Sequence, residues 1–181
     1  MQKSAETIIT HTKQWLEKIV IGCNFCPFAA KPFFQDKIRY RLVASAQKKD
    51  ILEALVRECS WLEENAETET SLLILAEGYE KFNAYLDLLD LAEQLLEKEG
   101  YEGIFQLASF HPDYRFAGSK ADDAANYTNR SPYPILHLLK EESIEKALEK
   151  FPDPDKIPDK NIAFAREKGL DYMKNLLKSC L

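Results

Sequence analysis

A histidine and the polar residues after it form the densest group of chemically active side chains in the sequence. An apolar run from 104 to 110 is typical of a strand, and it ends directly before His111. The segment that follows, up to the next apolar run at 135, mixes acids, arginines, asparagines and tyrosines. Connections this long are usually functional or disordered, and the aromatic content argues against disorder. We therefore predict an ordered loop that carries a functional site.

Cys26 is the candidate nucleophile for this site. Pro27 follows it, and proline is favoured at the first position of a helix, so Cys26 is expected at a helix N-cap. There the backbone N–H groups and the helix dipole lower the pKa of a thiol. His111 would be the general acid/base within hydrogen-bonding reach of Cys26, and Asp113 would orient its imidazole. Two alternatives stay open: Cys26 is a buried, inert residue, or it packs beneath His111 and Asp113, which do acid/base work alone.

Side chains that suit an anionic substrate also gather in the loop. The predicted substrate-binding residues are Arg115, Asn126, Asn129, Arg130 and Ser131. Arginine binds carboxylate or phosphate through two parallel hydrogen bonds. A Gly-rich phosphate-binding signature is missing. The alternative is a self-stabilising loop, in which asparagine and serine bond to local backbone and Arg130 pairs with one of two nearby aspartates.

A metal site is a weaker interpretation. Cys23 and Cys26 have ligand spacing, and His111 with Asp113 or His137 could complete a set of four ligands. Zinc sites usually contain two such paired elements, and the sequence has one. We therefore predict no metal, and the sequence identifies no cofactor.

The two other histidines are expected to have structural or solvated positions. His137 lies inside an apolar, strand-like run, so we expect a buried side chain with a satisfied hydrogen bond. His11 lies in a polar part of the first predicted helix, so we expect it to be solvated.

Length, charge and cysteine content limit the class of protein. The 181 residues, 45% of them hydrophobic, fit a single domain spanning 1–181. A net charge of -6 and a pI near 5.2 argue against nucleic-acid binding, which needs a basic surface. No apolar run has the ~18 residues of a membrane-spanning helix, and the start lacks the features of a signal peptide. Four cysteines are too few for a disulfide scaffold, so we expect free thiols and a cytoplasmic location. The oligomeric state stays open.

Strand-like and helix-like segments alternate along the chain. The predicted strands are 38–44, 71–76, 104–110 and 135–139, and the predicted helices are 4–22, 50–64, 82–100, 143–151 and 161–177, with a break at Gly169. This alternation predicts an α/β fold with a mostly parallel sheet of about four strands flanked by helices. The fourth strand is free to run antiparallel, because no helix is evident in the loop before it. His111 then lies just past the carboxyl end of the third strand, where ligands bind in open α/β sheets.

Four motifs resemble those of a known family. They are Cys26-Pro-Phe-Ala29, Ser109-Phe-His-Pro-Asp-Tyr114, Phe116-Ala-Gly118 and Asn126-Tyr-Thr-Asn-Arg-Ser-Pro-Tyr-Pro134. Through them the chain resembles the bacterial family of uncharacterised proteins catalogued as domain of unknown function 1415. The resemblance runs from the helix around Trp15 to the one ending near Phe151, and it implies no activity. The family usually has leucine at the position of Cys23, which counts against a role for that thiol.

The leading hypothesis is a small enzyme, a hydrolase or transferase, that acts on an anionic small molecule through a Cys/His site. A second hypothesis is a non-catalytic binding protein for an anionic metabolite or cofactor. A third is an interaction protein whose loop docks a partner beside an exposed apolar patch. A titratable pair in contact within the pocket would favour the enzyme, and donors alone would favour the binding protein.

Overall fold

The computed structural model describes residues 3–149 and 151–181, and a four-stranded sheet lies at its centre. The strands are β1 (Ile38–Val43), β2 (Thr70–Leu75), β3 (Phe105–Phe110) and β4 (Ile135–Lys140). Their order in the sheet is β1-β2-β4-β3. β1 and β2 are parallel, whereas β4 is antiparallel to both β2 and β3. The sheet is therefore mixed, and the carboxyl ends of β1, β2 and β3 lie at the same end of it.

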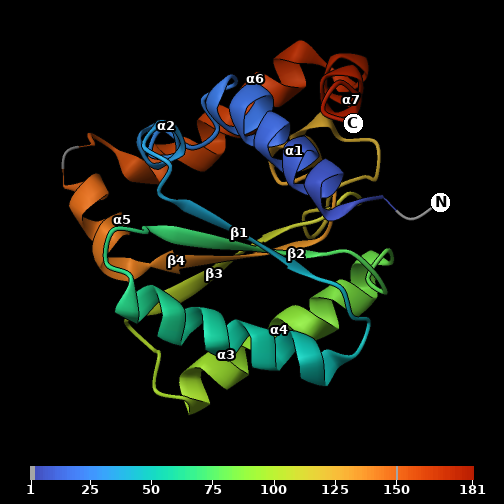
Figure 1. The fold of residues 1–181 in the computed structure, drawn as a ribbon. Coiled ribbons are helices and arrows are strands. Elements are labelled where there is room, and N and C mark those ends of the chain that lie inside the picture. The colour runs from blue at the N-terminus through green and yellow to red at the C-terminus, as the bar shows by residue number, and fades with distance from the viewer. Residues whose placement is uncertain (1–2, 150) are drawn as a thin grey trace.

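Helices cover both faces of this sheet, as Figure 1 shows. One face is covered by α3 (Lys48–Glu64) and α4 (Phe82–Lys98). The other is covered by α1 (Ala5–Trp15), its π-helical continuation η1 (Leu16–Ile21), α2 (Ala30–Phe34), α6 (Ile157–Lys168) and α7 (Leu170–Lys178). The remaining helices are α5 (Glu141–Leu148) after β4 and the short η2 (Ala124–Thr128) and η3 (Pro154–Lys156). The predicted α/β fold is confirmed.

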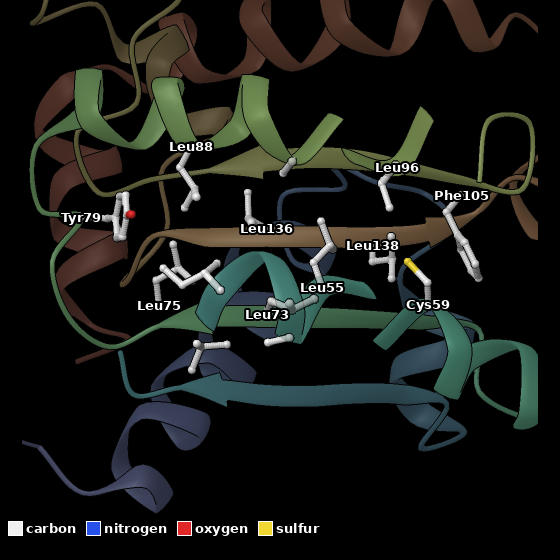
Figure 2. Packing of buried hydrophobic residues seen from close by; sticks show 14 of the residues in the cluster. Leu55, Cys59, Leu73, Leu75, Tyr79, Leu88, Leu96, Phe105, Leu136 and Leu138 are labelled. Carbon is white, nitrogen blue, oxygen red and sulfur yellow. The ribbon is translucent and has the colours of Figure 1, made fainter. Parts of the chain in front are cut away.

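The central strand β2 explains why two separate cores form. All six of its residues are buried, as its continuous apolar run predicts. Leu73 and Leu75 pack with α3 and α4, whereas Leu72 and Ile74 pack with the helices of the opposite face. Figure 2 shows the first of these cores, in which side chains from α3 and α4 meet those of β2 and β4. Cys59 lies fully buried there, as predicted for a cysteine at helical spacing.

The edge strand β1 alternates as its sequence predicts. The apolar side chains that face the second core are Ile38, Tyr40 and Leu42. Arg39 faces α3, where its Nε donates to Oε2 of Glu58 at 2.8 Å. The hydroxyl of Ser71 donates to the same carboxylate at 2.8 Å. Glu58 is 3% exposed, so this bond network satisfies a charge that would be costly to bury alone.

Helix boundaries follow local signals in two cases and depart from them in a third. Ser4 caps α1 by accepting a hydrogen bond from the Thr7 amide at 3.2 Å, as predicted. Gly169 separates α6 from α7, and its φ of 84° suits glycine. The predicted start of a helix at Asp50 is wrong, because α3 already begins at Lys48. The Asp50 carboxylate instead accepts a hydrogen bond from the Ser45 hydroxyl at 2.6 Å.

Candidate functional site

The connections after β1, β2 and β3 meet at one end of the sheet, which we call the carboxyl end. The connection after β3, residues 111–134, is ordered, as predicted, and contains η2. Gly78 shows how closely the other two approach each other. Its φ is 87°, and a Cβ at this position would lie 2.5 Å from the Cβ of Ala46. Only glycine fits this approach without strain.

His111 lies directly after β3 but is not open to solvent. Its side chain is fully buried against Phe82 and Tyr85 of α4. Nδ1 accepts a hydrogen bond from the Asp113 backbone amide at 2.9 Å, so the proton lies on Nε2, which donates to the Tyr79 carbonyl at 2.8 Å. Burial lowers the pKa of His111, although the Tyr79 carbonyl opposes this shift. The imidazole is therefore neutral and joins the loops after β2 and β3.

Asp113 holds His111 in a different way from the one that the sequence suggests. The backbone N–H of Asp113 donates to the imidazole of His111. Asp113 itself is exposed to solvent. Both nitrogens of His111 are already bonded, so neither is available to take a proton from a nucleophile. The structure therefore shows a loop-anchoring arrangement at these two residues.

Cys26 lies on the opposite face of the sheet from His111. It packs against the second core, with α1, α6 and α7, and no hydrogen bond joins it to the imidazole. Cys26 is not the helix N-cap that the sequence predicts, because α2 begins at Ala30 and its N-cap is Ala29. The amides of Phe28 and Ala29 still bond to the Cys26 sulfur and lower the thiol pKa. Burial outweighs them, so the pKa of Cys26 is raised overall. The predicted Cys26–His111 pair is not formed in this structure.

The asparagine and serine side chains of the loop form hydrogen bonds with other groups of the loop and with the end of β3. Asn126 is fully buried, accepts from the Phe116 amide at 3.1 Å and donates to the Lys120 carbonyl at 2.8 Å. Asn129 donates to the Ser109 carbonyl at 3.2 Å. The buried Ser131 hydroxyl donates to the Tyr133 carbonyl. These contacts match the self-stabilising alternative.

The two loop arginines also bind backbone. Arg115 donates from Nε to the Ser119 carbonyl at 2.8 Å. Arg130 donates to the carbonyls of Tyr114 and Ala121, each at 3.1 Å, and its guanidinium lies 4.5 Å from the centre of the Tyr127 ring. The expected pairing of Arg130 with a nearby aspartate is not formed. Asp123 instead binds Arg166 of α6, with the closest contact at 2.8 Å.

A hollow of ≈ 290 Å³ opens at the carboxyl end, beside the start of α1. Its lining residues are Lys3, Ile8, Leu42, Ala44, Ala76 and Tyr133. They come from the segment before α1, from α1 itself, from the ends of β1 and β2, and from the end of the long loop. No aspartate or glutamate lines it within the part of the chain that the structure describes. The amine of Lys3 lies 5.4 Å from the centre of the Tyr133 ring. We call this the Lys3 hollow.

His11 lies beside the Lys3 hollow and contacts Tyr133, one of its lining residues. Nδ1 of His11 lies 2.8 Å from the Tyr133 hydroxyl, and the two rings stack with centroids 6.1 Å apart. Burial, and after it the charge of Lys3, lower the pKa of His11, so the imidazole is neutral at pH 7. His11 is only partly buried, and the sequence did not predict its contact with Tyr133. Tyr133 lies 122 residues further along the chain, so no local pattern reveals this contact.

A second hollow, of ≈ 270 Å³, lies at the opposite end of the sheet, near the start of β3. Four of its lining residues are acidic: Glu93, Glu97, Glu102 and Glu141. We call it the glutamate hollow. Among residues 3–149 and 151–181, no group of three or more histidine, cysteine or acidic side chains is arranged to hold a metal. Within the same ranges, no helix is long and apolar enough to cross a membrane.

Fold and site together define an open α/β protein whose sheet is capped at the carboxyl end by a long ordered loop. The family described as "Protein of unknown function (DUF1415)" matches residues 7–175, and the chain belongs to it. The resemblance drawn from the motifs is thereby confirmed. No similar protein was found among the curated proteins, and none among the solved structures.

Proposed function

We propose that this protein binds a small anionic molecule in the Lys3 hollow. The observation that carries the proposal is the pairing of an ammonium group with an acid-free hollow in a chain of net charge -6. Within the described residues Lys3 has no ion-pair partner, so its charge is available to a ligand. The position supports the proposal as well, because ligands of open α/β sheets bind outside the carboxyl ends of strands.

The binding-protein hypothesis has more support than the Cys/His enzyme. Cys26, His111 and Asp113 do not form a contact through which a nucleophile could be activated. The side chains of Asn126 and Ser131 donate to backbone carbonyls. Arg115 and Arg130 also donate to carbonyls, so only their remaining N–H groups could bind an anion. We therefore assign the two arginines no more than an auxiliary attraction for anions. A cytoplasmic location belongs to the same proposal and is supported by four free cysteines.

A titration followed by nuclear magnetic resonance tests the proposal, with inorganic phosphate as the probe. Saturable shifts are expected at the amides of Ile8, Ala44 and Ala76, and none at Gly103 beside the glutamate hollow. The variant Lys3→Gln should weaken binding about fivefold to tenfold, because it removes one charge-assisted contact.

The matched control is Lys98→Gln, which makes the same charge change at an exposed residue. Lys98 is the last residue of α4 and does not line the Lys3 hollow. It should leave the phosphate affinity unchanged. Equal losses in both variants would mean that phosphate responds only to net charge, and the proposal would fail. Shifts confined to the glutamate hollow would contradict it as well.

A hydrolase or transferase is a second candidate because of one contact, the 2.8 Å approach of His11 to the Tyr133 hydroxyl. A neutral imidazole beside a phenol can take up or release a proton at the rim of the Lys3 hollow. Hydrolysis of p-nitrophenyl butanoate offers a direct assay. The enzyme hypothesis expects His11→Gln and Tyr133→Phe each to reduce the rate at least tenfold without changing phosphate affinity. A wild-type rate equal to the rate in buffer would contradict the enzyme hypothesis, and anion binding would remain as the proposed function.

A further inference from the structure

We propose that the ligand of the Lys3 hollow is a small monocarboxylate with an apolar body. The inference rests on the proposed function and names its ligand class. It follows from the size, the lining and the single charge of the hollow, taken in turn below.

The size of the Lys3 hollow restricts the ligand to a small molecule. Pockets for drug-sized ligands range over about 300–1,000 Å³. The Lys3 hollow, at ≈ 290 Å³, is just below that range. A nucleotide or a dinucleotide would extend well beyond it. A carboxylic acid with a few carbon atoms, or one aromatic ring, fits the available space.

The lining explains why the ligand should have an apolar body. Ile8, Leu42, Ala44 and Ala76 contribute only hydrocarbon side chains, and the Tyr133 hydroxyl is already bonded to His11. A ligand covered with hydroxyl groups would lose its bonds to water here and find few replacements. A hydrocarbon chain instead gains by leaving water.

One positive charge selects one negative charge. Lys3 is the single cationic side chain among the lining residues that the structure describes, and its amine lies over the ring of Tyr133. A diphosphate carries several charges and would need additional basic groups or a Gly-rich loop of amides. A carboxylate can bind the ammonium at the rim while its chain lies against the alanines and Leu42.

Calorimetric titration of the full chain with sodium acetate, butanoate and hexanoate tests the inference. Each additional methylene should tighten binding about fourfold until the hollow is filled, which corresponds to the transfer of one CH₂ from water. Hexanoate should bind at least tenfold more tightly than phosphate. 1-Hexanol, which has the chain but no charge, should bind more weakly than hexanoate by the factor that Lys3→Gln costs.

A filled hollow provides the second variant. Ala44 is exposed and lines the Lys3 hollow, so Ala44→Leu should occupy space there without damaging the core. It should weaken hexanoate at least tenfold and acetate less than twofold. Ala121→Leu, at an exposed loop position away from the lining, is the control and should change neither affinity.

The outcomes separate the inference from the function on which it rests. Equal affinities across the carboxylate series, with phosphate still dependent on Lys3, would overturn the ligand class and leave the anion site standing. If neither phosphate nor any carboxylate binds, both fail. Affinity that rises with chain length but does not depend on Lys3 would reduce the site to a hydrophobic surface and would also overturn the inference.

Discussion

The two ends of the sheet carry hollows of nearly the same size and opposite chemistry. The Lys3 hollow measures ≈ 290 Å³ and has one ammonium group, and the glutamate hollow measures ≈ 270 Å³ and has four glutamates. Volume therefore does not distinguish them as ligand sites. Their charge does, because an anion is repelled from one end of the molecule and attracted to the other.

The surrounding backbone differs as well. At the carboxyl end, connections from three strands interlock through His111, Asn126 and the close approach at Gly78. Near the glutamate hollow, Gly103 has open space around it. The carboxyl end is therefore the more closely interlocked of the two. We expect substitutions at its crowded or hydrogen-bonded residues to cost the most stability.

The largest expected effect is that of adding one methyl group at Gly78. Gly78→Ala should lower the free energy of unfolding by about 3–4 kcal/mol, since a strained φ and a clash with Ala46 act together. Gly103→Ala is the matched control, with a φ of 74° but no atom within 4 Å of its Cβ, and should cost about 1 kcal/mol. Urea unfolding of both variants measures the difference. Equal losses would show that the two ends are equally tolerant.

Removing the buried amide of the loop should have the next largest effect. Asn126→Ala leaves the Phe116 amide without a partner and removes one bond each from the Ser119 hydroxyl and the Lys120 carbonyl. Urea unfolding should record a loss of about 2–3 kcal/mol. Asn129→Ala, at a half-buried position in the same loop, should cost about 1 kcal/mol. The self-stabilising interpretation would be wrong if Asn126→Ala were the milder change.

A histidine in the sheet between the two ends gives a pH-dependent effect of about 2 kcal/mol. Nε2 of His137 lies 2.6 Å from the Thr70 hydroxyl, and burial lowers its pKa to about 4. Its folded pKa is below the value of 6.5 for an unfolded chain, so the unfolded state takes up the proton first as pH falls. This contribution is complete above pH 6.5 and is lost progressively toward pH 4.

Urea unfolding of wild type and of His137→Gln at pH 7.5 and at pH 5 isolates this term. Between the two pH values the wild type should lose about 2 kcal/mol more than the variant. An equal loss would mean that groups other than His137 account for any acid sensitivity.

The smallest expected effect is a direct test of the charge contrast. Lys3→Glu should weaken phosphate binding by more than Lys3→Gln does, at least about tenfold, which is about 1.4 kcal/mol. Glu97→Lys at the glutamate hollow should change the affinity less than twofold at 0.15 M salt. The strands that separate the two ends have six residues, roughly 20 Å, which exceeds the ~8 Å over which exposed charges interact. A large effect of Glu97→Lys would mean that long-range charge governs binding.

The main elements of the fold were predictable from local patterns. The apolar run of β2, the alternation of β1 and the break at Gly169 each follow from a short stretch of sequence. The π-helical turn η1 and the strand order depend on packing between distant segments, so they left no local signal.

The sequence predicted the end of the sheet at which the long loop lies, but not the contacts that its residues make there. The position of His111 after β3 correctly indicated the end of the sheet at which the loops meet. Its partners are a backbone carbonyl and a backbone amide, which every residue has and which no motif can identify. Lys3, His11 and Tyr133 are brought together only by the packing of α1 beside the long loop.

The ion pair between Asp123 and Arg166 has a consequence for how the protein is made. During synthesis, residues 38–140, which contain every strand of the sheet and the loop itself, leave the ribosome before α6. The helix that carries Arg166 and packs against η2 emerges only afterwards. The sheet can thus assemble before this clamp on the loop is able to form.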